Sequence, residues 1–191
     1  MKGVNIFLAE GFEEIEAIAT LDVLRRGGID VRTVSITEDL VVTGAHGQKV
    51  AADAVWSDVK ATTTSNGTSI YDVMIFPGGM PGTKHLAENH ELMDMMKLHY
   101  GDGGTVAAIC AAPGLVVSQL PTLKGKKFTC YDGFEAAPTA KGGEYFKLPF
   151  VVDGNLITGR GPGCAVDFAL AIVAQLKGSS LAAEVRSAMM I

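Results

Sequence analysis

Cys110 is the residue of this sequence best placed to do chemistry. It lies between residues 105–109, an apolar run typical of a buried strand, and residues 111–117, which predict the start of a helix with Pro113 tolerated in its first turn. Backbone N–H groups and the positive end of the helix dipole lie beside such a residue, so we expect a thiol pKa below its usual ~8.5. A cysteine there can act as a nucleophile or react with peroxide. The alternative is an inert buried thiol, as most free cysteines are.

Two carboxylates could assist such a cysteine. Glu13 and Glu16 fall in the first turns of a helix predicted over residues 13–26, where acidic residues are also favourable partners of the helix dipole. Residues three apart share one side of a helix, so the spacing does not choose between them. A protonated carboxyl beside Cys110 would donate a hydrogen bond to the thiolate, and an ionised one would act as a base.

Glycine-rich turns could complete the site. Residues 77–79, Pro-Gly-Gly, fit a tight turn, or alternatively a close approach in which the N–H groups of Gly79 and Ala111 form an oxyanion hole. Residues 159–163 match the dinucleotide-binding fingerprint poorly, because they lack the third glycine at the required spacing. We interpret this turn as one that lines the site or holds an anion, with Arg160 as its charged group.

Other polar residues are candidates for lining the same site. His46 lies in a glycine-bounded turn, and Cys130 and Tyr131 follow a short strand-like run. The alternative for Cys130, and for Cys164, is inert packing. The remaining histidines fall in or near a polar helix face and are expected to be solvated (His85, His90, His99).

Composition narrows the class of protein. The chain has 191 residues and a formal net charge of -5, which gives no basic surface for nucleic acid or membrane binding. No apolar run approaches the ~20 residues of a membrane helix, and a signal peptide is not indicated. Three cysteines argue against a disulfide framework and favour a reducing, cytoplasmic setting. No metal-ligand spacing is present, so we expect no metal and no organic cofactor.

Strands and helices alternate along the chain. Apolar runs predict four strands, at residues 4–8, 29–36, 73–76 and 105–109. Helices are predicted at 13–26, at 86–99, which is rich in methionine, and from near Gly163 onwards. Hairpins are predicted at 40–52 and 151–157, and a polar loop at 62–68. The apolar stripe expected on the first helix comprises Ile15, Ile18, Leu21, Val23 and Leu24.

This alternation predicts one α/β domain over residues 1–191, with a mainly parallel central sheet and helices on both faces. Sites in such sheets lie at the carboxyl ends of the strands. The acidic residues after the first strand, the Pro-Gly-Gly turn and Cys110 all follow strands, so we expect them to meet there.

The chain also resembles the DJ-1/ThiJ/PfpI superfamily, in its DJ-1-like branch. The resemblance covers nearly the whole chain and depends on five segments in the right order: residues 9–17, 22–29, 77–79, 107–113, and 160–163 together with 168–173. It implies a flavodoxin-like three-layer sandwich and a homodimer. It further implies that Cys110 is a strained elbow cysteine and that Glu16 is the protonated carboxyl bonded to its sulfur.

The same resemblance assigns the oxyanion N–H groups to Gly79 and Ala111 and places Arg160 near the pocket. His46 stands where related sequences often carry an arginine near the dimer contact. One position departs from the pattern, because Tyr131 replaces a histidine that many relatives carry. A tyrosine, with a usual pKa near 10, is a poor base at neutral pH, which puts family activities that need that histidine in doubt.

Three functions follow from these expectations. The first is a glutathione-independent glyoxalase or deglycase-like enzyme, which acts on reactive carbonyls or glycated adducts through Cys110 and Glu16. The second is a redox sensor or chaperone-like protein that works through oxidation of Cys110. A thiamine-pathway or amidase-like role is ranked lowest, because no motif supports it.

Overall fold

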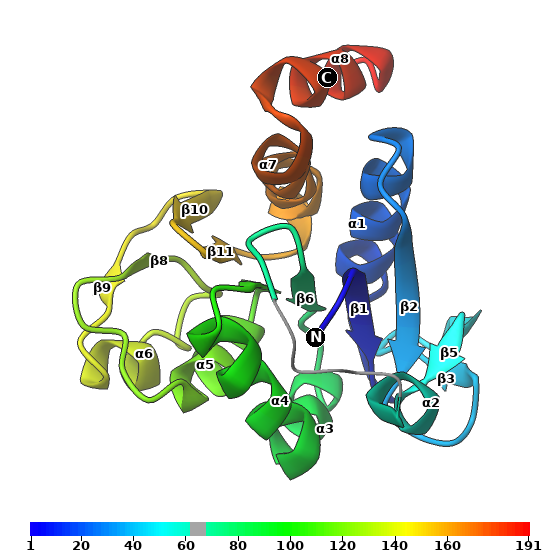
Figure 1. Cartoon of the computed structure of the whole chain (residues 1–191), viewed down its shortest axis with the longest axis vertical. Helices are drawn as coiled ribbons and strands as arrows, with labels where there is room; N and C mark the ends of the chain where they lie inside the picture. The colour runs from blue at the N-terminus through cyan, green and yellow to red at the C-terminus, as the bar shows by residue number, and fades with distance from the viewer. Residues whose placement is uncertain (62–67) are drawn as a thin grey trace.

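A seven-stranded sheet forms the centre of the computed structural model, which describes residues 1–61 and 68–191 (Figure 1). The strand order is β10-β11-β7-β6-β1-β2-β5. All neighbouring strands are parallel except β10, which is antiparallel to β11. The strands are β1 (Val4–Leu8), β2 (Val31–Ser35), β5 (Ala54–Val55), β6 (Val73–Phe76), β7 (Thr105–Ile109), β10 (Phe150–Asp153) and β11 (Leu156–Gly159).

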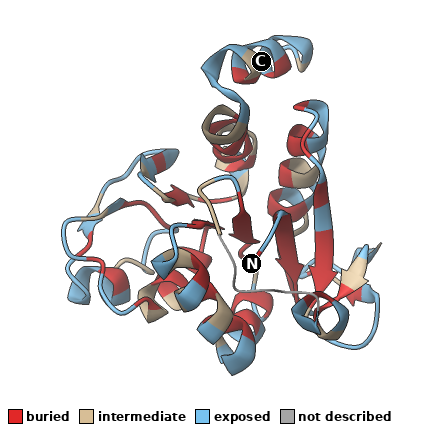
Figure 2. Ribbon diagram, viewed as in Figure 1, coloured by how far each residue is buried: buried red, intermediate tan, exposed pale blue. Residues whose placement is uncertain are grey.

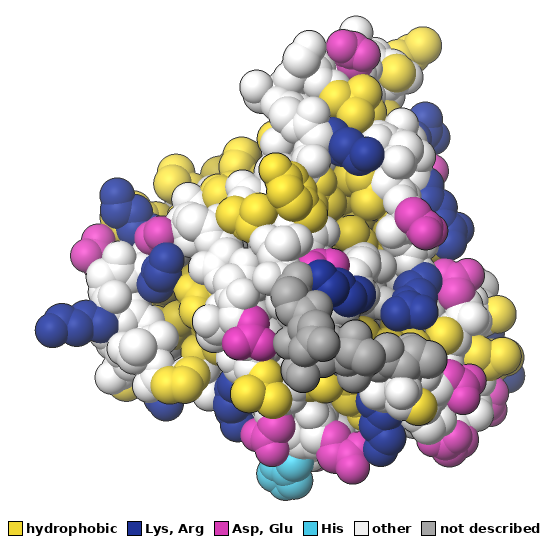
Figure 3. Space-filling view, in the orientation of Figure 1, with side chains coloured by type: hydrophobic (Ala, Val, Ile, Leu, Met, Phe, Trp, Pro, Cys, Tyr) yellow, Lys and Arg dark blue, Asp and Glu magenta, His cyan; other side chains and the backbone are white. Residues whose placement is uncertain are grey.

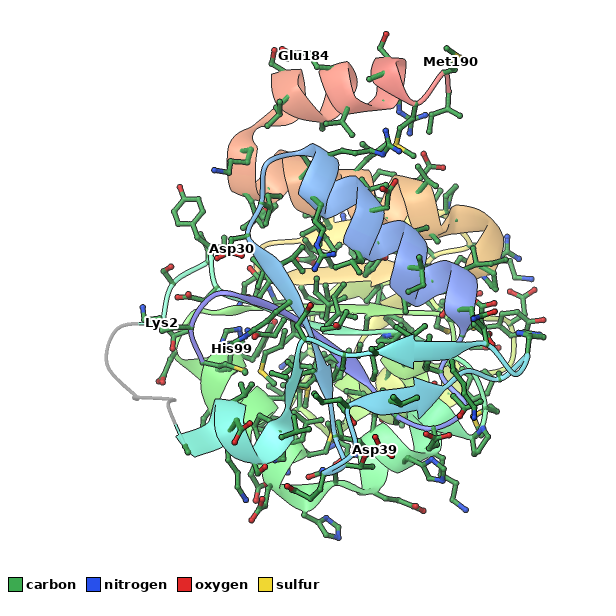
Figure 4. The ribbon with its side chains drawn as sticks, turned by 90° about the vertical axis from the view of Figure 1, so that its right-hand side faces the viewer. Lys2, Asp30, Asp39, His99, Glu184 and Met190 are labelled. Carbon is green, nitrogen blue, oxygen red and sulfur yellow. The ribbon has the colours of Figure 1, made fainter. Side chains whose placement is uncertain are left out.

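Helices cover both faces of this sheet. One face carries α1 (Glu14–Arg26), α7 (Ala165–Lys177) and α8 (Ser179–Ala188). Figure 4 shows α1 lying against α7, with α8 across their ends. The other face carries α2 (Trp56–Ala61), α3 (Gly82–Glu88), α4 (His90–Gly101) and α5 (Ala112–Leu115). The predicted three-layer, flavodoxin-like sandwich is therefore confirmed.

Alternation along the strands divides the core in two. In β1, Ile6 and Leu8 pack against the α1, α7 and α8 side, whereas Phe7 packs on the opposite side with Phe76 and Trp56. Successive residues of a strand point to opposite faces, so a strand covered on both faces is apolar throughout. Figure 2 shows the central strands as buried along their length.

Smaller elements complete the structure. The predicted hairpin at 40–52 is the antiparallel pair β3 (Val41–Thr43) and β4 (Lys49–Ala51), and β10 and β11 form the hairpin predicted at 151–157. β8 (Lys127–Phe128) and β9 (Glu144–Tyr145) form a separate pair. Short helical turns comprise α6 (Ala136–Ala140), η1 (Val117–Gln119) and η2 (Pro162–Cys164). Apart from Thr68, the predicted polar loop lies outside the described residues.

The helix predicted over residues 86–99 is instead two helices, α3 and α4, separated at Asn89. Asn89 has extended backbone dihedrals, and its side chain accepts a hydrogen bond from Leu92 N–H. An asparagine in this position caps a new helix rather than continuing the previous one. The predicted core role of the methionines holds for Met93 and Met96, which are buried.

The predicted apolar stripe on α1 is partly wrong. Ile15 is 57% and Ile18 38% exposed. Val23 and Leu24 are buried as predicted, and the helix also buries Ala17 and two polar residues, Glu16 and Thr20. Helix α1 is rotated about its axis so that Ala17 and Leu24 pack against the sheet and α7. This orientation leaves both isoleucines exposed and places Glu16 in the interior.

His99 also departs from expectation, because it is buried rather than solvated. Its ring nitrogens lie 3.2 Å from the amino group of Met1 and 3.0 Å from the Thr105 carbonyl oxygen. Figure 4 shows it near Lys2. Burial lowers the pKa of His99 to about 4. Its role is therefore structural packing at the end of the sheet opposite the carboxyl ends of the strands.

The surface is mixed in charge. Basic and acidic side chains of the described residues are interspersed over the face seen in Figure 3. Among the described residues, no helix combines the length and apolar character needed to cross a bilayer.

Candidate functional site

Cys110 follows β7 directly, in a strained backbone conformation. Its φ is 65°, in the left-handed region that residues with a side chain seldom adopt. Its N–H donates to the Gly159 carbonyl at 3.0 Å, and its own carbonyl accepts from Tyr131 N–H at 2.8 Å. These two bonds hold the residue on both sides. The turn therefore presents the sulfur in a fixed position at the carboxyl end of the sheet.

The structure separates the two carboxylates that the sequence left equivalent. Glu13 caps α1, because its Oε2 accepts from Glu16 N–H at 2.7 Å. Glu16 lies in the interior, only 1% exposed, with its side chain hydrogen-bonded to that of Cys110. Its Oε2 accepts from Gly78 N–H at 2.6 Å. Glu16 is thus the carboxyl beside the sulfur, and Glu13 fixes the helix turn that carries it.

Glu16 is built to hold a proton near neutral pH. Burial raises its pKa to about 7, against the opposing effect of its hydrogen bonds to Gly78 and Cys110. Its Oε1 is buried and has no well-formed hydrogen bond to the described residues. An ionised oxygen in that state is costly, whereas a protonated carboxyl can donate to the sulfur.

The prediction of a low pKa for the Cys110 thiol is wrong. Burial and the neighbouring Glu16 carboxylate raise the pKa of the thiol, and the N–H groups of Ala111 and Gly79 lower it by less. The prediction counted those N–H groups and the helix end but not the carboxylate or the burial. Glu16 and Cys110 therefore behave as a pair that readily gives up one proton but resists losing the second.

Two glycines allow the backbone to approach Cys110 and Glu16 closely. A Cβ on Gly78 would lie 2.6 Å from both Cys110 Cβ and Glu16 Oε2. Gly79 has a φ of 90° and packs against the backbone of Glu13. The N–H groups of Gly79 and Ala111 lie near the Cys110 side chain, where they lower the pKa of the thiol. They lie where an oxyanion formed at the sulfur would need donors, and their catalytic role stays a prediction. Sequence reasoning did not single out Gly78.

His46 lies outside this cluster, on the exposed tip between β3 and β4. Its Nδ1 is 2.8 Å from Glu14 Oε2, and its backbone N–H donates to Glu14 Oε1 at 2.7 Å. That contact raises the pKa of His46. His46 and Glu14 therefore tie the hairpin to the start of α1. Among the described residues, Glu13, Glu14 and His46 place donor atoms within 4.8 Å of one another, but backbone N–H groups already occupy carboxylate oxygens of both glutamates.

A cavity of about 360 Å³ is lined by residues that include Tyr131, whose N–H donates to the Cys110 carbonyl. Tyr131 and Arg160 line it, with Asp132 and Cys164, so two of the predicted lining residues come together there. Cys130 does not take part. It is fully buried, and burial raises its pKa to about 12, as expected of an inert thiol.

The chain matches a known protein family over most of its length. The model of the DJ-1/PfpI family matches residues 2–175. Protein DJ-1 homolog A of Arabidopsis thaliana is 36% identical over 190 residues, which make up 100% of this chain and 47% of that protein. The chain thus spans about half the length of this relative.

Two further relatives match over most of their own length. The glutathione-independent glyoxalase DJR-1.2 of Caenorhabditis elegans is 35% identical over 169 residues, covering 88% of this chain and 85% of that protein. The crystal structure of a DJ-1 superfamily protein from Salmonella typhimurium superposes with a TM-score of 0.87 at 34% identity, covering 100% of this chain and 98% of the other. With its elbow cysteine, its buried glutamate and this match over most of its length, the chain belongs to the DJ-1/PfpI family.

Proposed function

We propose that this protein is a glutathione-independent enzyme that converts 2-oxoaldehydes such as methylglyoxal into 2-hydroxy acids. The observation that carries the proposal is the buried Glu16 carboxyl beside the Cys110 side chain, with the N–H groups of Gly79 and Ala111 close to the same sulfur. This arrangement combines a nucleophile, a proton carrier and oxyanion donors at one point.

The first step is covalent capture of the aldehyde. In the reactive form of the pair, the proton resides on Glu16 and the sulfur of Cys110 is a thiolate. The thiolate attacks the aldehyde carbon, and the carbonyl electrons move to oxygen, facing the N–H groups of Gly79 and Ala111. The proton of Glu16 passes to that oxygen. The product is a hemithioacetal, and Glu16 is left as a carboxylate.

The second step moves a proton between neighbouring carbons. The Glu16 carboxylate removes the hydrogen of the former aldehyde carbon as a proton, which gives an enediolate. It then returns that proton to the adjacent carbon, while the hydroxyl proton on the first carbon passes to the oxygen of the second and a carbonyl forms on the first. The result is a thioester of the 2-hydroxy acid on Cys110. Water cleaves the thioester, releases the acid and restores the thiol. Methylglyoxal and one water thereby become lactate, with no net change in oxidation level.

A pKa near 7 suits Glu16 to both halves of this cycle, because the carboxyl gives and takes a proton at similar cost near neutral pH. The thiol supplied by the chain itself fits an activity that does not need glutathione. The C. elegans relative bears that activity in its name. Tyr131, which lines the neighbouring cavity, stands where many relatives carry a histidine. The proposed route needs no histidine at that position.

The experiment that tests capture is protection of Cys110 from alkylation. The protein is treated with iodoacetamide at neutral pH, with rising methylglyoxal, and labelling of each cysteine is read by peptide mass mapping. We expect saturable protection of Cys110, with Cys130 and Cys164 as internal controls. Equal protection of all three cysteines, or none at Cys110, contradicts capture at this site.

Oxidation of Cys110 is the second candidate. The same N–H groups and the Glu16 proton would stabilise a sulfinate on Cys110, whose oxygen atoms are bonded to the sulfur itself. A mass gain of two oxygens on Cys110 at low peroxide, without aldehyde turnover, would favour this function over the first.

A homodimer, glycated adducts as further substrates and a cytoplasmic setting complete the proposal. Exposed apolar side chains on α1 and the neighbouring hairpin, among them Ile15, Ile18 and Val41, support self-association. Light scattering on the purified protein tests it, and a monomeric mass at micromolar concentration contradicts it.

A further inference from the structure

The cavity that Tyr131 and Arg160 line is linked to Cys110 through the backbone on two sides. It is lined by Tyr131, Asp132, Arg160, Gly161, Pro162, Gly163 and Cys164. Tyr131 N–H donates to the Cys110 carbonyl, and Arg160 directly follows Gly159, whose carbonyl accepts from Cys110 N–H. Two walls of the cavity are therefore held against the backbone of Cys110. The cavity volume of about 360 Å³ suits a small organic molecule.

Charged side chains gather at one edge of this cavity. The Asp132 carboxylate receives Arg160 Nη2 at 3.0 and 3.1 Å, Lys147 Nζ at 3.0 Å and the Tyr145 hydroxyl at 3.2 Å. Two cations thus contact one carboxylate, and a second carboxylate, Glu135, lies close enough to help raise the pKa of Tyr145. These contacts also hold the pKa of Asp132 below its usual range, so it stays ionised.

Arg160 has N–H donors that its ion pair with Asp132 does not use. It uses Nη2 alone on Asp132, while Nε and Nη1 donate no hydrogen bond to the residues that the structure describes. A guanidinium group recognises carboxylates through paired N–H donors. Gly163 and Cys164 line the same cavity at the start of the thirteen-residue helix α7, where the helix dipole adds partial positive charge. Cys164 forms no side-chain cap on that helix.

We propose that this cavity is a subsite for a carboxylate carried by the substrate, and that Arg160 is the residue that selects it. The preferred substrates are then 2-oxoaldehydes whose carbon chain ends in a carboxylate. The inference rests on the proposed function for its substrate class, but the carboxylate subsite has a binding readout of its own.

The kinetic test compares two five-carbon 2-oxoaldehydes that differ in charge. 4,5-Dioxopentanoate carries the carboxylate, and 2-oxopentanal is its neutral counterpart. We expect kcat/KM to favour the carboxylate compound by about tenfold or more, as for a charge-assisted hydrogen bond. Arg160→Gln should bring the ratio close to one. Arg26→Gln, which removes an exposed arginine on α1 that pairs with Asp22, serves as the matched control and should keep the ratio.

The binding test does not depend on turnover. Levulinate, 4-oxopentanoate, has the ketone and carboxylate but no aldehyde, and 2-pentanone lacks the carboxylate. Calorimetry should detect levulinate binding to the wild-type protein, at least tenfold weaker binding to Arg160→Gln, and no comparable binding of 2-pentanone. If levulinate binds but neither aldehyde is turned over, the subsite stands and the proposed function fails. Equal kcat/KM for both aldehydes, or levulinate binding that Arg160→Gln leaves unchanged, overturns the carboxylate subsite.

Discussion

Replacing Glu16 by glutamine removes a carboxyl that folding buries almost completely. The substituted glutamine is not expected to disturb the packing, since its amide can still accept from Gly78 N–H and donate to the sulfur. The consequence is thermodynamic. A carboxyl whose pKa rises from 4.5 to about 7 on folding costs stability at neutral pH, because the unfolded chain ionises more readily.

The magnitude and the pH window follow from these two pKa values. Below pH 4.5 the carboxyl is protonated in both states and costs nothing. Between 4.5 and about 7 only the unfolded state ionises, so the wild type loses stability as pH rises. At about 1.4 kcal/mol per pH unit, the loss reaches about 3 kcal/mol and is constant above about pH 7. Glu16→Gln should therefore match the wild type near pH 4 and be about 3 kcal/mol more stable at pH 8.

Urea unfolding from pH 4 to 8, followed by the fluorescence of Trp56, measures this difference. Trp56 is the single tryptophan and lies in the core, so its emission reports on folding. Glu88→Gln is the matched control, because Glu88 is 61% exposed, and its difference from wild type should stay small throughout. A Glu16→Gln difference that does not change with pH, or a wild type that gains on the variant as pH rises, would refute the raised pKa.

Two further substitutions test the surroundings of the pair, and a third tests the core on the other face of the sheet. Gly78→Ala should lower turnover about 100-fold while circular dichroism stays native, because its Cβ would lie 2.6 Å from Cys110 Cβ and displace the reacting groups; unchanged turnover contradicts the close packing. Glu13→Ala should cost about 1 kcal/mol of unfolding free energy in urea by removing the cap of α1, and no loss of stability means that the cap is not needed. Phe7→Ala should cost about 3–5 kcal/mol by thermal or urea unfolding, since Phe7 is fully buried against Phe76 and Trp56, and a cost below 1 kcal/mol is incompatible with that packing.

Local patterns in the sequence predicted much of the fold. The apolar run before Cys110 and Pro113 after it predicted a strand, a sharp turn and a helix, and the structure has β7, the elbow and α5 there. Both hairpins were predicted from glycine-containing turns. The helix boundary at Asn89 was missed, because an asparagine within an otherwise helical pattern can be identified as a cap only when its backbone conformation is known.

The geometry of the site depends on tertiary packing, which the periodicity of the sequence does not determine. The rotation of α1 about its axis decides whether Glu13 or Glu16 meets Cys110, and that rotation is set by contacts with α7 and the sheet. The resemblance to DJ-1 proteins named Glu16, and the geometry supplies the reason. The direction of the Cys110 pKa shift was missed because burial and the Glu16 charge are properties of the assembled site. Asp132, which gathers Arg160, Lys147 and Tyr145, gave no signal in the sequence.

The central claim is that Cys110 and Glu16 together turn over 2-oxoaldehydes. Its most direct test is lactate formation from methylglyoxal without glutathione, by the wild type, Cys110→Ser and Glu16→Gln, each verified as folded. We predict steady lactate production by the wild type, which both substitutions reduce by at least 100-fold, with a pH dependence that rises near pH 7. Lactate production that survives either substitution, or none by the wild type, would contradict the claim.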